Sequence, residues 1–413
     1  ASDVYKRQHK NPSGNPVINM PGGSGKSVVI ASIVRDAISK WPGTRILMLV
    51  HSKELVEQNY KKLRALWPNA PVGIYSASLN RRELGEPITY AGIGSVRNRA
   101  KQIGRIDLCL VDEAHAISTT ETGTYRKLLA DLLDINPSMR IVGLSASPYR
   151  LGQGMINEGD EAIFNEVIEP VSIKELVYQG YLAPLRSKVT KHKLNTDGLH
   201  KRNGEYITSE MEQRFNTEDN NNHVVKEVMK MASGYKHWLI FCSGIEHSEN
   251  IAQCFRDAGI SAESLTSAAT KTERENKLVD FESGKIRALC NVGILTTGYD
   301  FQDLDCIVFL RATISPGLYL QMAVRGMRPK QHTDHCLVLD FVGNVKFHGP
   351  ITAVEPPSKK GNGVAPIKEC PECSEIVLAS TKECPSCGYM FPAGDQKEKI
   401  IQLSDADIMG NDD

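Results

Sequence analysis

The chain has 413 residues, which is enough for two or three domains with separate cores. Its 49 Lys and Arg residues equal its 49 Asp and Glu residues, which excludes a protein that holds nucleic acid by a uniformly basic surface. Because no apolar run approaches the ~20 residues that span a bilayer and no secretory signal is visible, we expect a cytoplasmic protein without a membrane partner.

The chain starts without Met, and Ala1 to Gln8 resemble translated adaptor sequence from assembled sequencing fragments. We therefore predict that residues 1–8 are a sequencing artefact. A first domain then covers residues 9–185 and lacks its natural N-terminus.

Short apolar runs alternate with amphipathic helical stretches in the first domain, which is typical of a parallel α/β sheet. The runs are almost wholly apolar, as expected when helices cover both faces of the sheet. The predicted strands are Val17–Asn19, Arg45–His51, Ile106–Val111 and Arg140–Leu144, and the predicted helices include Ser27–Lys40 and Lys53–Leu66.

The alternation pauses between residues 151 and 222, where Gly and polar residues dominate, apart from a short helical segment at Ser172–Gly180. Residues 186–222 are predicted to be a connector, and residues 223–354 a second α/β lobe. The elements predicted there are strand His237–Cys242, helices Glu246–Ala258 and Thr272–Glu282, strands Ile286–Val292 and Cys306–Leu310, helix Pro316–Met327 and strand Cys336–Phe341. Residues 355–366 have the composition of a linker, residues 367–392 contain four clustered cysteines, and residues 393–413 form an acidic tail.

Residues Met20 to Ser27 (Met-Pro-Gly-Gly-Ser-Gly-Lys-Ser) follow a predicted strand and open a predicted helix, which is the setting of a phosphate-binding loop. Glycines let backbone N–H groups approach phosphate oxygens, and a helix N-terminus favours negative charge. Lys26 would reach the β- and γ-phosphates, and Ser27 would bind Mg²⁺. The motif requires Gly or Ala where Met20 stands, so a glycine-rich turn is the alternative. The predicted nucleotide-binding residues are Gly22, Gly23, Ser24, Gly25, Lys26 and Ser27.

Val111-Asp112-Glu113-Ala114-His115 ends an apolar strand, and functional sites of α/β sheets lie at such carboxyl ends. Asp112 would hold Mg²⁺ through water, and Glu113 would position or deprotonate the attacking water. Together with the Gly-Lys-Ser upstream, this tetrapeptide favours ATP hydrolysis over an acidic surface turn.

With these motifs the chain resembles a superfamily-two helicase of the DEAH-box kind. Further segments match in the family's order: Val50–Leu55 (motif Ia), Gly94–Val96 (Ib), Leu144–Arg150 (III), Ile240–Cys242 (IV), Thr296–Asp300 (V) and Gln321–Arg328 (VI). The resemblance covers roughly residues 15–351. It implies an α/β fold of two tandem RecA-like lobes, with ATP and Mg²⁺ as cofactors.

The chain resembles RadD-type bacterial and phage helicases in particular. Two segments, Leu337–Val345 and Phe347–Pro350, match the end of that family's second lobe. This implies an ATP-dependent DNA helicase or translocase in DNA repair or replication, with single-stranded or branched DNA as partner and RNA as an alternative. The chain departs from the family at Gly22 and Ser147, where Thr is usual, and at Val324, where Gly is usual. The adenine-reading Q motif is also absent, which puts adenine specificity in doubt.

Arg325 and Arg328 are three residues apart on a predicted helix and would share one face. Guanidinium forks suit the charge on a transferring phosphoryl group, although taken alone the pair is more typical of a solvated helix end. In the family they reach ATP from the second lobe, and the resemblance adds Gly298 and Asp300 to the nucleotide site.

The resemblance also implies a sequence-independent nucleic-acid track across both lobes. Its predicted contacts are Ser52, Ser95, Arg97, Ser243 and Thr296. Residues that would couple this track to ATP are His115, Ser145, Ser147 and Gln321.

Cys370-Pro-Glu-Cys373 and Cys384-Pro-Ser-Cys387 form two CxxC pairs, a spacing that predicts a four-thiolate structural Zn²⁺ site in a zinc ribbon. A disulfide is not expected in the cytoplasm, and a redox pair would need a thioredoxin-like surrounding. The ribbon could contact nucleic acid or a protein partner.

Two alternatives stay open. The chain could be the motor subunit of a restriction system or an RNA helicase, although no nuclease motif is visible. It could also be a non-catalytic nucleic-acid-binding scaffold, which Met20, Gly22 and Val324 favour and the intact Lys26 and Glu113 oppose.

Overall fold

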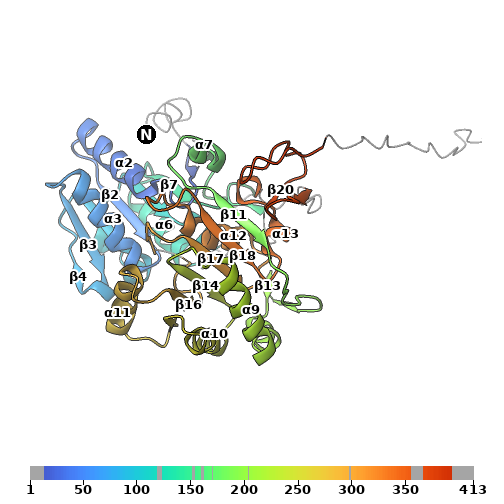
Figure 1. The fold of residues 1–413 in the computed structure, drawn as a ribbon. Coiled ribbons are helices and arrows are strands. Elements are labelled where there is room, and N and C mark those ends of the chain that lie inside the picture. Colours follow the sequence, from blue (N-terminus) through green and yellow to red (C-terminus); the bar gives the residue numbers. More distant parts are fainter. Residues whose placement is uncertain are drawn as a thin grey trace, which may run out of the picture.

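The computed structural model describes residues 14–118, 123–150, 154–159, 162–169, 171–202, 204–296, 299–354 and 366–392. These residues form two α/β lobes that lie side by side and a small C-terminal ribbon against the second lobe (Figure 1). Within these ranges no helix has the length and apolar character needed to cross a membrane.

The first lobe is built on an eight-stranded sheet that is parallel throughout except for its last strand. Its strands, in order across the sheet, are β10 (Glu166–Ile168), β1 (Pro16–Asn19), β7 (Arg140–Ser145), β6 (Leu108–Asp112), β2 (Ile46–Val50), β5 (Ile88–Gly92), β3 (Val72–Ser76) and β4 (Arg81–Arg82). The four strands predicted from apolar runs are present, and β3, β4, β5 and β10 were not predicted. β3 contains Gly73, where a Cβ atom would lie 2.9 Å from Glu83, so close packing rather than apolar character determines that residue.

Helices cover both faces of this sheet, as the apolar runs predicted. Successive residues of β2 point to opposite sides: Met48 packs with α2 and α3, whereas Leu49 packs with the helices of the other face. The helices are α2 (Lys26–Lys40), α3 (Lys53–Leu66), α4 (Ile93–Val96), α5 (Ala100–Ile103) and α6 (Thr124–Ile135).

The second lobe is a fully parallel six-stranded sheet. Its strands, in order, are β11 (Leu185–Val189), β18 (Cys336–Asp340), β17 (Cys306–Leu310), β14 (Trp238–Cys242), β16 (Ala288–Asn291) and β15 (Ala262–Leu265). Its helices are α8 (Thr208–Phe215), α9 (Glu218–Met231), α10 (Ile245–Asp257), α11 (Lys271–Glu282), α12 (Pro316–Ala323) and α13 (Asn344–His348), and α7 (Ile173–Tyr178) lies between the lobes in the chain. The predicted strands and helices of this lobe are found within a few residues of their predicted bounds.

The predicted connector, residues 186–222, contains an edge strand of the second sheet. β11 pairs in parallel with β18, with Leu185 opposite Cys336, and Leu194, Met211 and Phe215 of the predicted connector are buried in the second core. Sequence reasoning missed this strand because β11 lies at the edge of the sheet and its three central residues, Arg-Ser-Lys, are polar, so it forms no apolar run.

The predicted helix Pro316–Met327 is shorter than expected. α12 ends at Ala323, and a 3-10 turn, η3, covers Val324–Met327. Here the chain packs so closely on β18 that a Cβ atom at Gly326 would overlap the Cys336 sulfur. Arg325 lies in this turn and Arg328 follows it in extended backbone, so the prediction that both share one α-helical face is wrong.

Candidate nucleotide site and zinc centre

The segment predicted to bind phosphate, residues 20–27, connects β1 to the start of α2, which is the predicted setting. Gly23 (φ 78°) and Gly25 (φ 86°) have left-handed backbone, a conformation that other L-residues rarely adopt. No side chain caps the start of α2, so its first N–H groups are available to an anion.

Lys26 and the two carboxylates at the end of β6 form a compact charged cluster. The Lys26 Nζ atom lies 2.7 Å from Glu113 Oε1 and 3.2 Å from Asp112 Oδ1. Burial alone would raise the pKa of Glu113, but the charges of Lys26 and His115 outweigh burial and hold this pKa at about 2. Burial would likewise lower the pKa of Lys26, and the two carboxylates raise it instead. The charged forms of Lys26 and Glu113 therefore stabilise each other.

Glu113 and the segment after β7 are joined through His115. Glu113 has left-handed backbone (φ 52°), and its Oε2 atom is buried without a hydrogen-bond partner among the described residues, 3.4 Å from His115 Nδ1. His115 Nδ1 lies 2.8 Å from Ser145 Oγ, which also accepts the backbone N–H of Ser147 at 3.1 Å. Three of the predicted coupling residues thus lie in one hydrogen-bonded row.

Sequence reasoning missed Asn59. It is a buried residue of α3, and its Nδ2 atom donates to Asp112 Oδ2 at 3.2 Å. A buried amide holding this carboxylate fixes its orientation. The available signal was an Asn on the apolar face of α3, beside Val56 and Leu63.

The arginines of the second lobe lie on the same seam. Arg325 donates to backbone oxygens of Thr296 (2.8 Å), Gln321 (3.2 Å) and Tyr299, and burial lowers its pKa to about 10. Arg328 pairs with both oxygens of Asp300 at 2.6 Å.

Arg328 also reaches across the seam, where its Nη1 atom donates to Gly23 O at 3.1 Å. The small cavity between the lobes, about 30 Å³, is lined by Lys26 and Glu113 on one side and by Gln321 and Arg325 on the other. The predicted acidic residues, the lysine and the arginines are far apart in the sequence, and the fold brings them together at this seam.

Two residues that depart from the family pattern meet at this seam. A Cβ atom at Gly22 would overlap Val324 Cγ2, so the side chain of Val324 occupies the space that a larger residue at position 22 would need. Next to it, Gly317 of α12 faces Ser147, whose Oγ would lie 3.0 Å from a Cβ there. Relative to the family pattern, Gly22 has lost a side chain and Val324 has gained one, and the side chain gained at Val324 fills the space left at Gly22.

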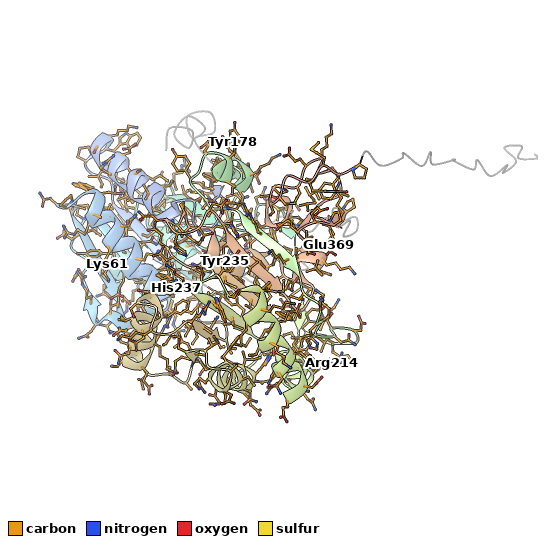
Figure 2. All side chains as sticks on the ribbon, viewed as in Figure 1. Lys61, Tyr178, Arg214, Tyr235, His237 and Glu369 are labelled. Carbon is orange, nitrogen blue, oxygen red and sulfur yellow. The ribbon has the colours of Figure 1, made fainter. Side chains whose placement is uncertain are left out.

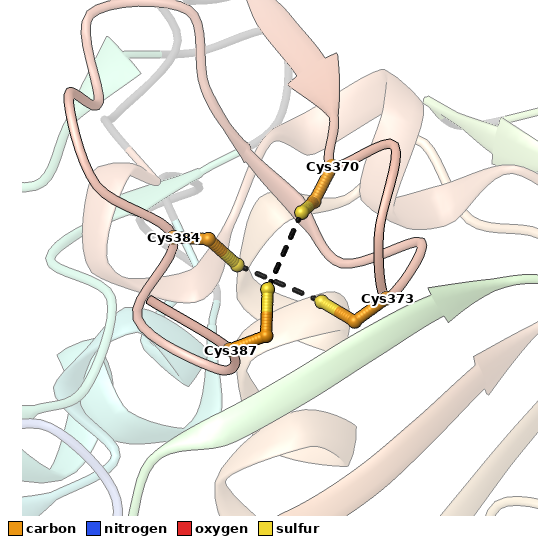
Figure 3. A group of neighbouring side chains, drawn as sticks. All are labelled: Cys370, Cys373, Cys384 and Cys387. Atoms are coloured by element: carbon orange, nitrogen blue, oxygen red, sulfur yellow. Dashed lines mark hydrogen bonds between the residues drawn. The ribbon is translucent and has the colours of Figure 1, made fainter. Parts of the chain in front are cut away.

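The four predicted zinc ligands converge at the end of the chain (Figure 3). All four sulfurs lie within 4.8 Å of one another, with 3.6 Å between Cys370 and Cys387 and between Cys373 and Cys384. Zn–S bonds of about 2.3 Å in a tetrahedron place sulfurs about 3.8 Å apart. The thiols therefore fit a structural zinc ion, which β19 (Ile367–Glu369) and β20 (Ile376–Leu378) flank as an antiparallel pair.

Three protein families match parts of this chain. "Type III restriction enzyme, res subunit" matches residues 1–150, "Helicase conserved C-terminal domain" matches residues 219–330, and "Uncharacterised protein family UPF0547" matches residues 368–393. The third match coincides with the cysteine ribbon.

Relatives of this chain share both lobes. A 51.5 kDa protein of a Lactococcus phage (isolate 7-9) is 30% identical over 393 residues, which cover 93% of this chain and 80% of the phage protein. The Saccharomyces cerevisiae protein "Putative ATP-dependent helicase IRC3" is 24% identical over 337 residues, covering 79% of this chain and 48% of its own length. The chain therefore spans about half the length of the yeast relative.

The chain belongs to the superfamily-two helicases. As a member of this family it is a nucleic-acid-dependent ATPase. Among solved structures, a fragment of a "putative HsdR subunit of a type I restriction enzyme" from Vibrio vulnificus YJ016 has a TM-score of 0.63 at 20% identity, covering 85% of this chain and 64% of that chain. That likeness shows the two-lobed fold.

The residues of this helicase that are predicted to contact nucleic acid all follow the ends of strands, but they differ in burial and in hydrogen bonding. Ser52 and Ser95 are half-buried and accept the backbone N–H groups of Leu55 and Ala77, and Arg97 is exposed. Ser243 is fully buried, and its hydroxyl lies 2.7 Å from His247 Nδ1, so the prediction that it faces nucleic acid is not met in this conformation.

Thr296 is also buried, and its hydroxyl donates to Gly293 O at 2.7 Å. Its carbonyl oxygen accepts a hydrogen bond from Arg325, which connects motif V directly to motif VI. The predicted nucleotide residue Gly298 lies outside the described residues.

Proposed function

We propose that this helicase is an ATP-driven DNA translocase of the RadD type within the DEAH-box group, acting in DNA repair or replication. One observation carries the proposal: Lys26, Asp112 and Glu113 of the first lobe share a seam with Arg325 and Arg328 of the second. A phosphoryl group held between them would be contacted by both lobes, so its loss on hydrolysis would change the contact between the lobes.

The residues present fit a magnesium nucleotide. Ser27 and Asp112 would hold Mg²⁺, and Lys26 would hold phosphate oxygens. When bound, ATP supplies the phosphoryl group that passes to water. The buried Oε2 atom of Glu113, which has no hydrogen-bond partner among the described residues, is suited to accept a hydrogen bond from that water.

Movement of Lys26 would prepare Glu113 for this task. Among the charges that hold the Glu113 pKa at about 2, Lys26 contributes most. A carboxylate with so low a pKa is a weak base. With Lys26 on a phosphate group, the carboxylate would lose that partner, its pKa would rise, and it would become a better proton acceptor. The chemistry of the base would thus depend on the nucleotide being in place.

The seam must also widen. Its cavity of about 30 Å³ is far smaller than a triphosphate needs. Nucleotide binding therefore requires the lobes to separate at Gly22 and Val324 while the arginines stay within reach. This movement would be transmitted to the track at Ser52, Ser95, Arg97 and Thr296.

The test is ATP turnover by the full chain with no polymer, with single-stranded DNA, with duplex DNA and with RNA. We expect stimulation by single-stranded DNA, and Lys26→Ala should reduce that turnover by on the order of 10³-fold because it removes a phosphate contact. Lys61→Ala, on the exposed face of α3, is the matched control. Stimulation by RNA alone, or absence of turnover in every condition, would contradict the proposal, the latter in favour of a scaffold.

A restriction motor subunit is the second candidate, favoured by the family match over residues 1–150. It would use the same ATP chemistry but would cleave DNA together with partner subunits. Translocation on DNA by the chain alone, without cleavage when a modification subunit is added, would favour the repair motor over this candidate.

A further inference from the structure

A groove separates the second lobe from the zinc ribbon. It has a volume of about 550 Å³ and lies at the carboxyl ends of β11 and β18. The loop after β11 forms one wall and β19 forms the other, and Figure 2 shows Glu369 of β19 beside β11. A Zn²⁺ ion bound by the four cysteines would hold β19, and with it one wall of the groove, in place.

This groove continues along the edge of the sheet. A second hollow of about 320 Å³ lies at the end of β17, and the two hollows share Thr196, Val342, Gly343 and Lys346. Since all strands of the sheet are parallel, Ser243 after β14 and Thr296 after β16 lie on the same edge. We call the joined hollows the ribbon groove. It leads from the ribbon toward the predicted nucleic-acid track.

Lysines line the ribbon groove. Lys188 and Lys346 form no ion pair within 4.0 Å among the described residues, and Lys193 is held by Thr190 Oγ1 at 3.0 Å and Asp340 O at 3.2 Å. The ammonium of a fourth lysine, Lys368, donates a hydrogen bond to Thr381 O at 2.6 Å.

The acidic side chains of the groove offset these charges only in part. Asp340 is buried and accepts the backbone N–H groups of Val342 and Val345, so its charge is directed into the fold. Asp197 and Glu369 are exposed on the walls. The free ammonium groups and their distribution along the groove suit an extended anion with repeated charges.

Aromatic side chains lie next to the lysines. Phe347, which adjoins Lys346, is 41% exposed, and Tyr206 is half-buried in the same hollow. Exposed aromatic rings beside cations are the means by which proteins hold single strands, with bases stacked on rings and phosphates paired with lysines. An acidic peptide would use the lysines but has no need of an exposed Phe.

We propose that the ribbon groove binds single-stranded nucleic acid that leaves the track between the lobes, with Lys188 and Lys346 on phosphates and Phe347 under a base. This proposal rests on the proposed function, because the motor supplies the strand that leaves the track and enters the groove. The zinc ribbon then acts as a clamp that lengthens the binding site of the motor.

The test uses the full chain and fluorescent oligo-dT of about 10 and about 30 nucleotides. Lys188→Glu/Lys346→Glu should weaken binding of the long oligonucleotide at least tenfold and reduce its salt dependence, the slope of log K against log salt, by about 1.4, which corresponds to two lost phosphate contacts. Phe347→Ala should weaken it by about tenfold. Lys61→Glu/Lys62→Glu, on α3 of the first lobe and far from the ribbon in Figure 2, should bind as the wild type does.

Turnover stimulated by the short oligonucleotide should stay within about twofold in the groove variants, because the track between the lobes is unchanged. Loss of long-strand binding with no stimulation in the wild type would support the groove and refute the motor. Unchanged long-strand affinity and salt slope in both groove variants would overturn the groove. The same holds if the lysine variant loses binding of a poly-glutamate peptide but keeps that of DNA, which would assign the groove to an acidic protein segment.

Discussion

His115 shows how a single buried side chain makes the first lobe sensitive to acid. Burial lowers its pKa below the ordinary value of 6.5, and the nearby Glu113 opposes this only in part. The unfolded chain therefore binds this proton more readily than the folded chain. The folded state keeps its full stability above pH 6.5 and loses stability as pH falls below that value.

We expect His115→Asn, which keeps a polar side chain near Ser145 but does not titrate, to lose less thermal stability between pH 7 and pH 5.5 than the wild type. Other histidines with lowered pKa values, such as His247 at about 4, act equally in both proteins. Melting curves without nucleotide measure the difference. His200→Asn, at an exposed position, is the control, and equal acid losses in the wild type and His115→Asn would refute the prediction.

Gly22 and Val324 make a second prediction at the scale of residues. Gly22→Ala places a Cβ atom against Val324 Cγ2 and should hold the lobes apart, at a cost of about 1–3 kcal/mol. Val324→Ala removes both Cγ atoms and should relieve that cost. The double variant should therefore turn over ATP better than Gly22→Ala alone, because its lobes can close again and bring the arginines to the phosphate.

A double-mutant cycle on kcat/KM checks this pairing, with an expected coupling of about 0.5–3 kcal/mol. Additive effects would show that the two positions act separately. The sequence indicated each residue as a departure from its family, but not their contact, because a contact between positions 302 residues apart depends on how the two lobes are set against each other.

At the scale of elements, burial decides what the sequence could predict. β2, β6, β14 and β17 are covered on both faces, so their apolar runs predicted them within a few residues. β11 is an edge strand and was missed. The charged cluster at Lys26 was predicted because each part lies in a short local motif, whereas Asn59 and the end of α12 at Ala323 were not, since tertiary packing determines them.

β11 also holds the zinc ribbon. Glu375 of the ribbon is buried, and its two carboxylate oxygens accept the backbone N–H of Ser187 at 3.0 Å and the hydroxyl of Ser386 at 3.1 Å. Replacing it leaves the Ser187 amide buried without an acceptor, at a cost of about 1–3 kcal/mol. This residue therefore joins ribbon and lobe through the edge of the sheet.

We predict that Glu375→Ala loosens the ribbon from β11 without loss of zinc. Hydrogen exchange at residues 187–189 should become faster, while metal analysis should still find one zinc ion per chain. Cys384→Ser should lose the zinc, and Glu372→Ala, at an exposed position of the same ribbon, should change neither quantity. Unaltered exchange in Glu375→Ala would show that other contacts hold the ribbon.

At the scale of the whole molecule, the lobes meet through contacts of very different strength. Arg328 bonds to Gly23 O at 3.1 Å, and Asp300 fixes its guanidinium. Arg274 of α11 lies 3.6 Å from Glu54 of α3, with both side chains about one-third exposed. Exposed pairs of this kind contribute about 0–1 kcal/mol, whereas an arginine at a transferring phosphoryl group changes turnover by 10³-fold or more.

We therefore expect Arg328→Ala to lower DNA-stimulated ATP turnover by on the order of 10³-fold and Arg274→Ala to leave it within about twofold. Both variants remove an arginine from the same seam, so the comparison separates phosphate contact from general attraction between the lobes. Fluorescence transfer between labels on the two lobes, with and without a non-hydrolysable nucleotide, should show nucleotide-dependent movement in the wild type and Arg274→Ala but a smaller change in Arg328→Ala. If both arginine variants lose turnover equally, the seam acts through overall charge, and Arg328 has no direct role at the phosphate.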